Sequence, residues 1–293
     1  MLKKLAFIVC LAVSQLHGMR AAECPVLAVH GLGTPQVFGK FYKEYVAQQL
    51  SISGKTIVYV DGPLSAQADF GQQHCQEYFK KSYESIDTRN GYIIHATSQG
   101  TATVLNFLAN NPEAQENLKA LILEAPMASG NSAIAHHVGI PLVEDFPLVP
   151  YLAKLIHFPG YRPSGMQAIK SIDQLINKNI VIILAHSTHD RILPYSGACA
   201  LYYGLKELGH CNVYFISKAG WDHTEVLNGE SVVKTILAKH DLVLSADASE
   251  SSDLSAYQPD HKGFWYRRAY KVIRFIEGMH TVIGKTGSLC LCR

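Results

Sequence analysis

Residues 91–100 read GYIIHATSQG, and the sequence pattern changes in the middle of this stretch. It begins as an apolar strand, and the helical pattern TATVLNFLAN follows directly after Gly100. Ser98 therefore lies at a joint between a strand and a helix, with the small residues Ala96 and Gly100 on either side. Small residues at these positions let the strand and the helix pass close together. A hydroxyl at this joint also lies at the positive end of the helix, where free backbone N–H groups favour a developing negative charge.

Short apolar runs that are rich in β-branched residues recur along the chain and alternate with helical patterns. Runs without polar interruptions are typical of parallel strands that are buried on both faces. We therefore predict an α/β fold, with a doubly wound, mostly parallel sheet of about six strands. The predicted strands are residues 25–29, 56–60, 92–97, 118–123, 180–185 and 213–217. Ligands in such folds bind at the carboxyl ends of the strands.

A serine at a strand-to-helix joint is not specific by itself, because it can simply cap the helix. Two later residues strengthen the catalytic interpretation. The strand VIILA is followed by HSTHDRILP, which places Asp190 just past its end. The next strand, VYFIS, is followed by KAGWDH, which places His223 past the end of the last strand. Serine, acid and histidine in this chain order characterise one fold in particular.

The chain resembles the α/β-hydrolases, specifically the serine hydrolases of the esterase and lipase type. Four segments carry the resemblance, which covers roughly residues 24–240: HGLG after the first strand, the turn around Ser98, DRILP at 190–194 and GWDH at 220–223. Ala96 stands where the family usually has glycine. Alanine is the smallest side chain that can replace glycine there.

The resemblance implies a role for each site residue. Ser98 is expected to be the nucleophile, His223 the general base and Asp190 the residue that orients the imidazole. The oxyanion hole is expected from the backbone N–H groups of Gln99 and Leu32. No cofactor and no metal are expected.

Three other titratable residues lie close to these strand ends in the sequence. Glu124, at the end of the strand LKALILE, is an alternative acid, because some hydrolases place the acid after that strand. Asp222 is adjacent to His223, and we interpret it as a loop cap. His95 lies within the apolar strand that precedes Ser98, and we interpret it as a core histidine.

His186 and His189 lie close to Asp190 in the sequence and could suggest a metal site. A metal site would need further ligands at a recognisable spacing, and the sequence offers no second cluster of that kind. We interpret both residues as loop histidines that line the cleft.

The N-terminus has the pattern of a secretory signal. Lys3 and Lys4 precede a short apolar stretch, and the polar SQLHG follows. We predict a signal peptide at residues 1–22 that is cleaved near 18–22, with a hydrolase domain at 23–240. The mature protein would then be secreted or periplasmic. An uncleaved membrane anchor is the alternative.

The cysteines fit an exported protein. The chain has 7 cysteines, and removal of Cys10 with the signal leaves an even number that could form disulfides. Cys199 and Cys211 flank one predicted helix and are the preferred pair. Free buried thiols are the alternative.

Residues 127–176 are predicted to form an insertion that caps the active site. The stretch VGIPLVEDFPLVPYLAKLIHFPG is broken by prolines, yet it is too apolar for a solvated loop. An apolar cap would suit an acyl or otherwise hydrophobic substrate. Alternatively, these apolar side chains only pack the insertion onto the core.

The last part of the chain changes composition twice. Residues 241–261 contain acids but no Lys or Arg and are predicted to be an acidic linker, whereas residues 262–293 are basic. Apolar side chains recur there at helical spacing, with basic ones on another face, which predicts a basic amphipathic helix followed by a cysteine tail. The helix can pack on the hydrolase core, which we favour. Otherwise residues 262–285 would make peripheral contact with a membrane.

The sequence thus predicts a secreted serine hydrolase that cleaves a carboxylic ester, with an acyl or lipid-like substrate slightly preferred. A peptidase or a thioesterase would use the same triad, and a non-catalytic binding module of the same fold is the alternative from another class. A formal net charge of +2 gives no general attraction to nucleic acid.

Overall fold

The structure is a computed structural model that describes residues 24–31, 39–50, 56–62, 69–137, 160–219, 223, 226–227 and 232–242. The predicted signal peptide and the predicted C-terminal helix lie outside these residues, as does the predicted linker from residue 243 onward. Within the described part of the chain, no helix is both long enough and apolar enough to cross a membrane.

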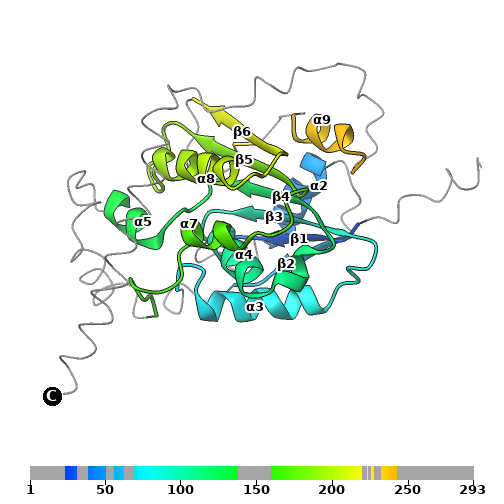
Figure 1. Cartoon of the computed structure of the whole chain (residues 1–293), viewed down its shortest axis with the longest axis horizontal. Coiled ribbons are helices and arrows are strands. Elements are labelled where there is room, and N and C mark those ends of the chain that lie inside the picture. The colour runs from blue at the N-terminus through cyan, green and yellow to red at the C-terminus, as the bar shows by residue number, and fades with distance from the viewer. Residues whose placement is uncertain are drawn as a thin grey trace, which may run out of the picture.

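A single six-stranded sheet forms the centre of the described residues (Figure 1). Its strand order is β2-β1-β3-β4-β5-β6, and every neighbouring pair is parallel. The predicted fold class and the six predicted strands are confirmed, with small shifts at the strand ends. The strands are β1 (Val26–Val29), β2 (Ile57–Val60), β3 (Tyr92–Thr97), β4 (Leu118–Glu124), β5 (Val181–Ser187) and β6 (Val213–Lys218).

Helices cover both faces of the sheet. Side chains alternate between the two faces along each strand, and apolar side chains on both faces require a covering layer on each. In β1, Leu27 and Val29 join the core beneath α3 (Gln73–Glu84) and α4 (Gln99–Asn110). Val26 and Ala28 join the core on the other face, beneath α2 (Gly39–Leu50) and α9 (Val232–Lys239). The longer helices are α2 (Gly39–Leu50), α3 (Gln73–Glu84), α4 (Gln99–Asn110), α8 (Tyr195–Glu207) and α9 (Val232–Lys239). The shorter ones are η4 (Pro112–Gln115), α5 (Gly130–His137), α7 (Ala168–Ser171) and η5 (Ile172–Gln174).

Only the two flanks of the predicted cap insertion are described. Residues 138–159, whose apolar side chains predicted the cap, lie outside the described residues. On the C-terminal flank, Ile169, Ile172 and Leu175 are fully buried in the core, and α7 packs against α4. This flank therefore packs onto the core of the described residues.

The preferred disulfide pair is wrong. Cys199 is buried within α8, whereas Cys211 is exposed beyond the end of that helix, and no disulfide bond joins them. A helix rises by about 1.5 Å per residue. The part of α8 after Cys199 therefore carries the chain well beyond the Cα separation of about 7 Å that a disulfide allows.

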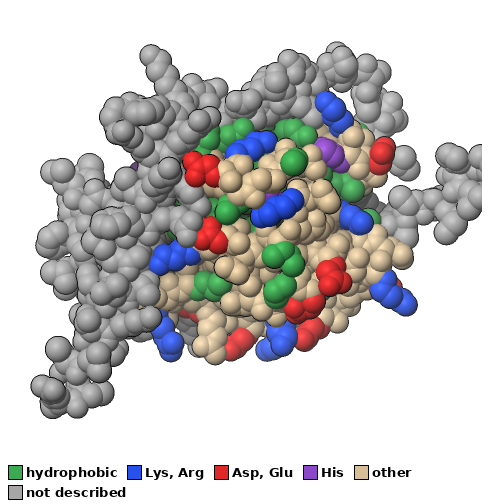
Figure 2. All heavy atoms as spheres, viewed as in Figure 1, with side chains coloured by type: hydrophobic (Ala, Val, Ile, Leu, Met, Phe, Trp, Pro, Cys, Tyr) green, Lys and Arg blue, Asp and Glu red, His purple; other side chains and the backbone are tan. Residues whose placement is uncertain are grey.

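The surface seen in Figure 2 carries charged groups of both signs, scattered among neutral and apolar side chains over the described residues. On this face the described residues form no large patch of a single charge.

Candidate active site

Ser98 lies in a strained turn between β3 and α4. Its φ is 56° and its ψ is −127°, a conformation that residues with a side chain rarely adopt. Neighbouring groups hold the turn, since the Ser98 N–H donates to Glu124 O at 2.9 Å and Thr101 N donates to Ser98 O at 3.0 Å. Such strain persists only where the surrounding structure enforces it, and it is typical of functional sites. Here it exposes the hydroxyl above the end of the strand.

Two glycines allow the backbone to approach this turn. A Cβ on Gly100 would lie 2.6 Å from His30 O and 2.8 Å from Val29 O, so α4 can start this close to β1 only with glycine at this position. A Cβ on Gly31 would lie 2.9 Å from the Cβ of Ser98. The loop after β1 therefore passes directly beside the nucleophile candidate.

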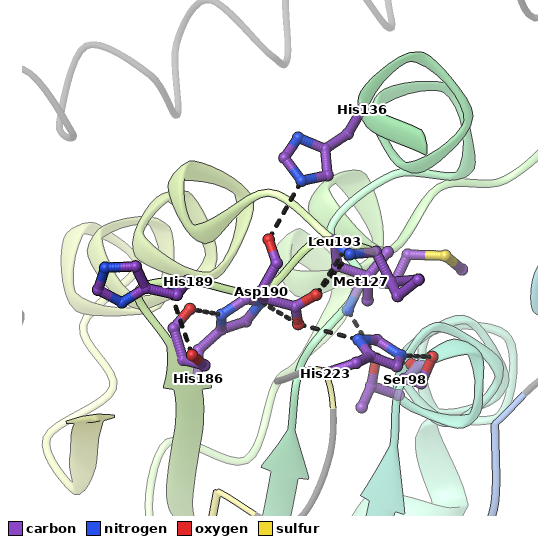
Figure 3. Close-up of polar contacts among 11 residues, drawn as sticks. Ser98, Met127, His136, His186, His189, Asp190, Leu193 and His223 are labelled. Atoms are coloured by element: carbon purple, nitrogen blue, oxygen red, sulfur yellow. Dashed lines mark hydrogen bonds and ion pairs between the residues drawn. The ribbon is translucent and has the colours of Figure 1, made fainter. Parts of the chain in front are cut away.

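The structure brings Ser98, His223 and Asp190 together at the carboxyl edge of the sheet (Figure 3). His223 Nε2 lies 2.7 Å from Ser98 Oγ, and His223 Nδ1 lies 2.9 Å from Asp190 Oδ2. A carboxylate can only accept, so Nδ1 carries the proton and Nε2 is left to accept from the serine hydroxyl. The side chain of Asp190 is fully buried, whereas 19% of the His223 side chain is exposed.

The turn after β5 fixes the carboxylate of Asp190. Its Oδ1 accepts hydrogen bonds from Ile192 N at 2.7 Å and Leu193 N at 2.9 Å, which leaves Oδ2 for His223. Burial by itself would raise the pKa of Asp190. The hydrogen bond from His223, its electrostatic interaction and that of His186 in their protonated forms, and the hydrogen bond from Leu193 N outweigh that effect and lower the pKa below its ordinary value. Asp190 is therefore ionised at neutral pH.

A serine at a strained strand-to-helix turn is followed in the chain by an acid past β5 and a histidine past β6, all on one edge of a parallel sheet. The fold is that of the α/β-hydrolases. No family model matches the chain, and no curated protein matches it either.

Solved structures of similar architecture include a monoacylglycerol lipase from Paleococcus ferrophilus, at 14% identity over 73% of this chain and 96% of that one, with a TM-score of 0.45. Another is Est1E from Butyrivibrio proteoclasticus, at 14% identity over 74% and 87%, with a TM-score of 0.47. A third is a highly thermostable carboxyl esterase from Bacillus coagulans, at 13% identity over 77% and 91%, with a TM-score of 0.45. These likenesses do not identify the substrate of this α/β-hydrolase-fold protein.

One of the two expected oxyanion-hole residues is described. Gln99 is the first residue of α4, so its backbone N–H belongs to the first turn, where N–H groups have no acceptor within the helix. Leu32, the other expected donor, lies outside the described residues, as does Asp222.

Three further histidines lie near the acid (Figure 3). His186 is part of β5 and fully buried, so the prediction that it lines the cleft as a loop residue is wrong. Its Nδ1 lies 2.8 Å from Ser187 O, and its Nε2 lies 3.6 Å from Asp190 Oδ2 without a hydrogen bond. Burial lowers the pKa of His186 and favours the neutral ring. His189 is exposed, and His136 Nε2 lies 3.3 Å from Asp190 O.

Glu124, the alternative acid, is not the partner of His223 in the structure. Its Oε1 accepts hydrogen bonds from Tyr45 Oη at 2.8 Å and Leu227 N at 3.1 Å. The sequence pattern alone does not indicate these contacts, because Tyr45 and Leu227 lie far from Glu124 in the chain.

His95 is fully buried, in agreement with its interpretation as a core residue. Its Nδ1 lies 2.9 Å from Tyr42 Oη, and burial lowers its pKa to about 3. The ring is therefore neutral at physiological pH.

A hollow of about 950 Å³ opens between α3 and the C-terminal end of α4, apart from the triad. Most of its lining residues have polar or charged side chains. The lining residues are Asp69, Gln72, Gln73, His74, Gln76, Glu77, Lys80, Phe107, Asn110, Asn111, Gly160, Arg162, Gly165 and Met166.

The close approach of Gly31 leads to a testable prediction. We expect Gly31→Ala to slow the reaction of Ser98 with a fluorophosphonate by about 10²-fold, because displacement of a reacting group by about 1 Å can have an effect of this size. The matched control is Gly62→Ala, since a Cβ on Gly62 would meet nothing within 4 Å. Equal labelling rates for the two variants would show that the loop containing Gly31 accommodates the added methyl group without displacing Ser98.

Proposed function

We propose that this protein is a serine hydrolase that cleaves carboxylic esters through a Ser98–His223–Asp190 triad. The observation that carries the proposal is the continuous hydrogen-bonded chain from Ser98 Oγ through both imidazole nitrogens to a buried, ionised carboxylate. A serine hydroxyl is a weak nucleophile at neutral pH until an adjacent base accepts its proton. The chain of hydrogen bonds supports this role for His223.

The proposed reaction proceeds by acyl transfer. Ser98 Oγ attacks the carbonyl carbon while its proton passes to His223 Nε2, and the C=O π electrons move onto the oxygen. Asp190 stabilises the imidazolium that forms. The new oxyanion lies at the start of α4, where the Gln99 N–H and the positive end of the helix favour negative charge.

The tetrahedral intermediate then breaks its bond to the leaving group. His223 returns the proton to the departing alkoxide, which leaves as an alcohol, and Ser98 keeps the acyl group. A water molecule next attacks the acyl carbon and gives its proton to His223 Nε2. The C–Oγ bond breaks, Oγ regains a proton, and the carboxylic acid is released.

The experiment that tests the proposal is labelling of the wild-type protein with a fluorophosphonate, followed by mass spectrometry of the digested product. We expect one phosphonylated residue, Ser98. No labelling in a folded sample would favour the alternative of a non-catalytic binding module.

The choice of ester rests on the resemblance to esterases and lipases, and the slight preference for an acyl or lipid-like substrate rests on the sequence of residues 127–176. A panel of chromogenic esters from short to long acyl chains, with matched amide and thioester substrates, would test both. Faster turnover of the amide or thioester would indicate the peptidase or thioesterase alternative.

Export is a separate part of the proposal, and membrane contact is the alternative to packing of the C-terminal helix on the core; both rest on sequence outside the described residues. N-terminal sequencing of the exported protein identifies the mature form. The mature protein and a form truncated after Asp260 are then each tested for co-sedimentation with lipid vesicles. Membrane contact through residues 262–285 predicts binding that needs anionic lipid, weakens with salt and disappears on truncation, since each basic residue near such a surface contributes about 1 kcal/mol. Unfolding of the truncated form would instead show that the helix belongs to the core.

A further inference from the structure

Glu124 lies at the centre of the sheet, next to β3, the strand that leads to Ser98. It is the last residue of β4 and is paired in register with Thr97, the residue before Ser98. Only 1% of Glu124 is exposed. A buried carboxylate requires hydrogen-bond donors around it. Those donors indicate what Glu124 does in this fold.

Donors from three separate elements converge on this carboxylate. Oε1 accepts from Tyr45 Oη in α2 at 2.8 Å and from Leu227 N in the loop after β6 at 3.1 Å. Oε2 lies 3.5 Å from Thr97 Oγ1 in β3. The bond to Leu227 reaches across more than a hundred positions of the chain and connects the sheet to the segment that carries His223.

Leu227 follows His223 by four positions, in the connection between β6 and α9. Val226 and Leu227 are both fully buried in the core beneath α2 and α9. The bond to Glu124 fixes the main chain of Leu227 at the height where β3 and β4 end. Through this bond, the backbone four residues after His223 is attached to the sheet.

The three triad residues differ in how they are held. Ser98 is fixed by the strained turn, and Asp190 by two backbone N–H groups, whereas His223 comes from a loop and has the most exposed side chain of the three. Its Nε2 must stay near Ser98 Oγ and its Nδ1 near Asp190 Oδ2, at 2.7 and 2.9 Å. The position of the loop backbone therefore determines whether both contacts form together.

We propose that Glu124 is a positioning residue for His223, and that it acts through the Leu227 N–H. The inference rests on the proposed function, because it assigns Glu124 to the same triad. A carboxyl group suits the task, since one of its oxygens can accept two hydrogen bonds, as Oε1 does from Tyr45 Oη and Leu227 N. The carboxylate that the sequence offered as an alternative acid would thus support the base.

Three substitutions separate this role from general stabilisation. Glu124→Met keeps the side-chain length but removes the acceptor, and Glu124→Gln keeps an oxygen for Leu227 N. Tyr45→Phe removes the second donor to Oε1 while leaving the Leu227 bond intact. We expect Glu124→Met to lower the rate of fluorophosphonate labelling and kcat by about 10- to 100-fold with little change in KM, because the base is displaced and substrate contacts are kept. Glu124→Gln should recover most of this loss, and Tyr45→Phe should label at nearly the wild-type rate.

A fourth change tests the single hydrogen bond even if Glu124→Met fails to fold. Replacement of the amide between Val226 and Leu227 by an ester removes the Leu227 N–H and leaves every side chain in place. We expect about a tenfold slower labelling of the folded ester-containing protein. A wild-type rate for this protein would overturn the proposal, and so would a wild-type rate for folded Glu124→Met.

A readout that needs no turnover separates this proposal from the proposed function. The His223 Nδ1–H that is bonded to Asp190 should give a downfield proton resonance, assigned by its absence in His223→Gln. We expect the resonance to persist in Tyr45→Phe and Glu124→Gln and to disappear in folded Glu124→Met. If the wild type shows the resonance but no labelling at Ser98, the proposed function fails, and the effect of Glu124→Met on the resonance still decides the positioning role.

Discussion

Replacement of Ser98 by alanine should abolish fluorophosphonate labelling and lower kcat by about 10⁴- to 10⁶-fold, the loss expected when triad residues act as a unit. The hydroxyl is the only group removed, and it supplies both the attacking oxygen, 2.7 Å from His223 Nε2, and the proton that this nitrogen accepts. The turn itself should survive. Alanine adopts the positive φ of this position no less readily than serine does, and the backbone bonds to Glu124 O and from Thr101 N do not involve the side chain.

The matched control for this substitution is Ser85→Ala, at an exposed serine whose hydroxyl donates locally to Ser82 O. Turnover and labelling of the control should equal those of the wild type, and thermal melts should show that both variants are folded. Undiminished labelling of Ser98→Ala would place the reactive group elsewhere and overturn the triad.

Much of the fold could be predicted from local sequence patterns. Each strand of the parallel sheet is buried on both faces, so its residues form an uninterrupted apolar run that is visible without any knowledge of its neighbours. The turn at Ser98 could be predicted for a similar reason, because its small neighbours Ala96 and Gly100 are close to it in the chain. Chain order then related Asp190 and His223 to the strand ends.

The contacts between distant segments could not be predicted in this way. The bond from Leu227 N to Glu124, and the turn amides that leave Asp190 Oδ2 for His223, depend on tertiary packing. Sequence position alone left both Glu124 and Asp190 as possible acids, since each follows a strand of the same sheet. The structure distinguishes them by what each carboxylate accepts.

The preferred disulfide pair fails, and the role of the apolar insertion flank could not be derived from the sequence, for a related reason. Cys199 and Cys211 are near in sequence, but a helix that contains one of them carries the chain away from it. Ile169 and Ile172 are apolar because they pack beneath the sheet-covering helices, and the sequence pattern cannot tell a core contact from a cap contact. Hydrophobicity predicts burial but does not identify the burying partner.

The neighbourhood of Asp190 determines what an amide would do at its position. In Asp190→Asn, the backbone N–H groups of Ile192 and Leu193 require an acceptor, so the amide oxygen should take the place of Oδ1. The NH₂ group would then occupy the place of Oδ2, 2.9 Å from His223 Nδ1 and 3.6 Å from His186 Nε2. His223 Nδ1 must now accept, so its proton moves to Nε2 and faces the serine hydroxyl.

With the proton on Nε2, His223 cannot take the proton of Ser98, and we expect Asp190→Asn to lose roughly 10⁴ in kcat. The fold should be kept, with a Tm that is unchanged or higher, because a buried charge is removed and the unpartnered Nε2 of His186 gains a donor. Kinetics with an activated ester, together with thermal melts, measure both effects. Glu124→Gln is the matched control and should lose far less, since it keeps an acceptor for Leu227 N. A large loss in Glu124→Gln and a small one in Asp190→Asn would place the triad acid at the end of β4.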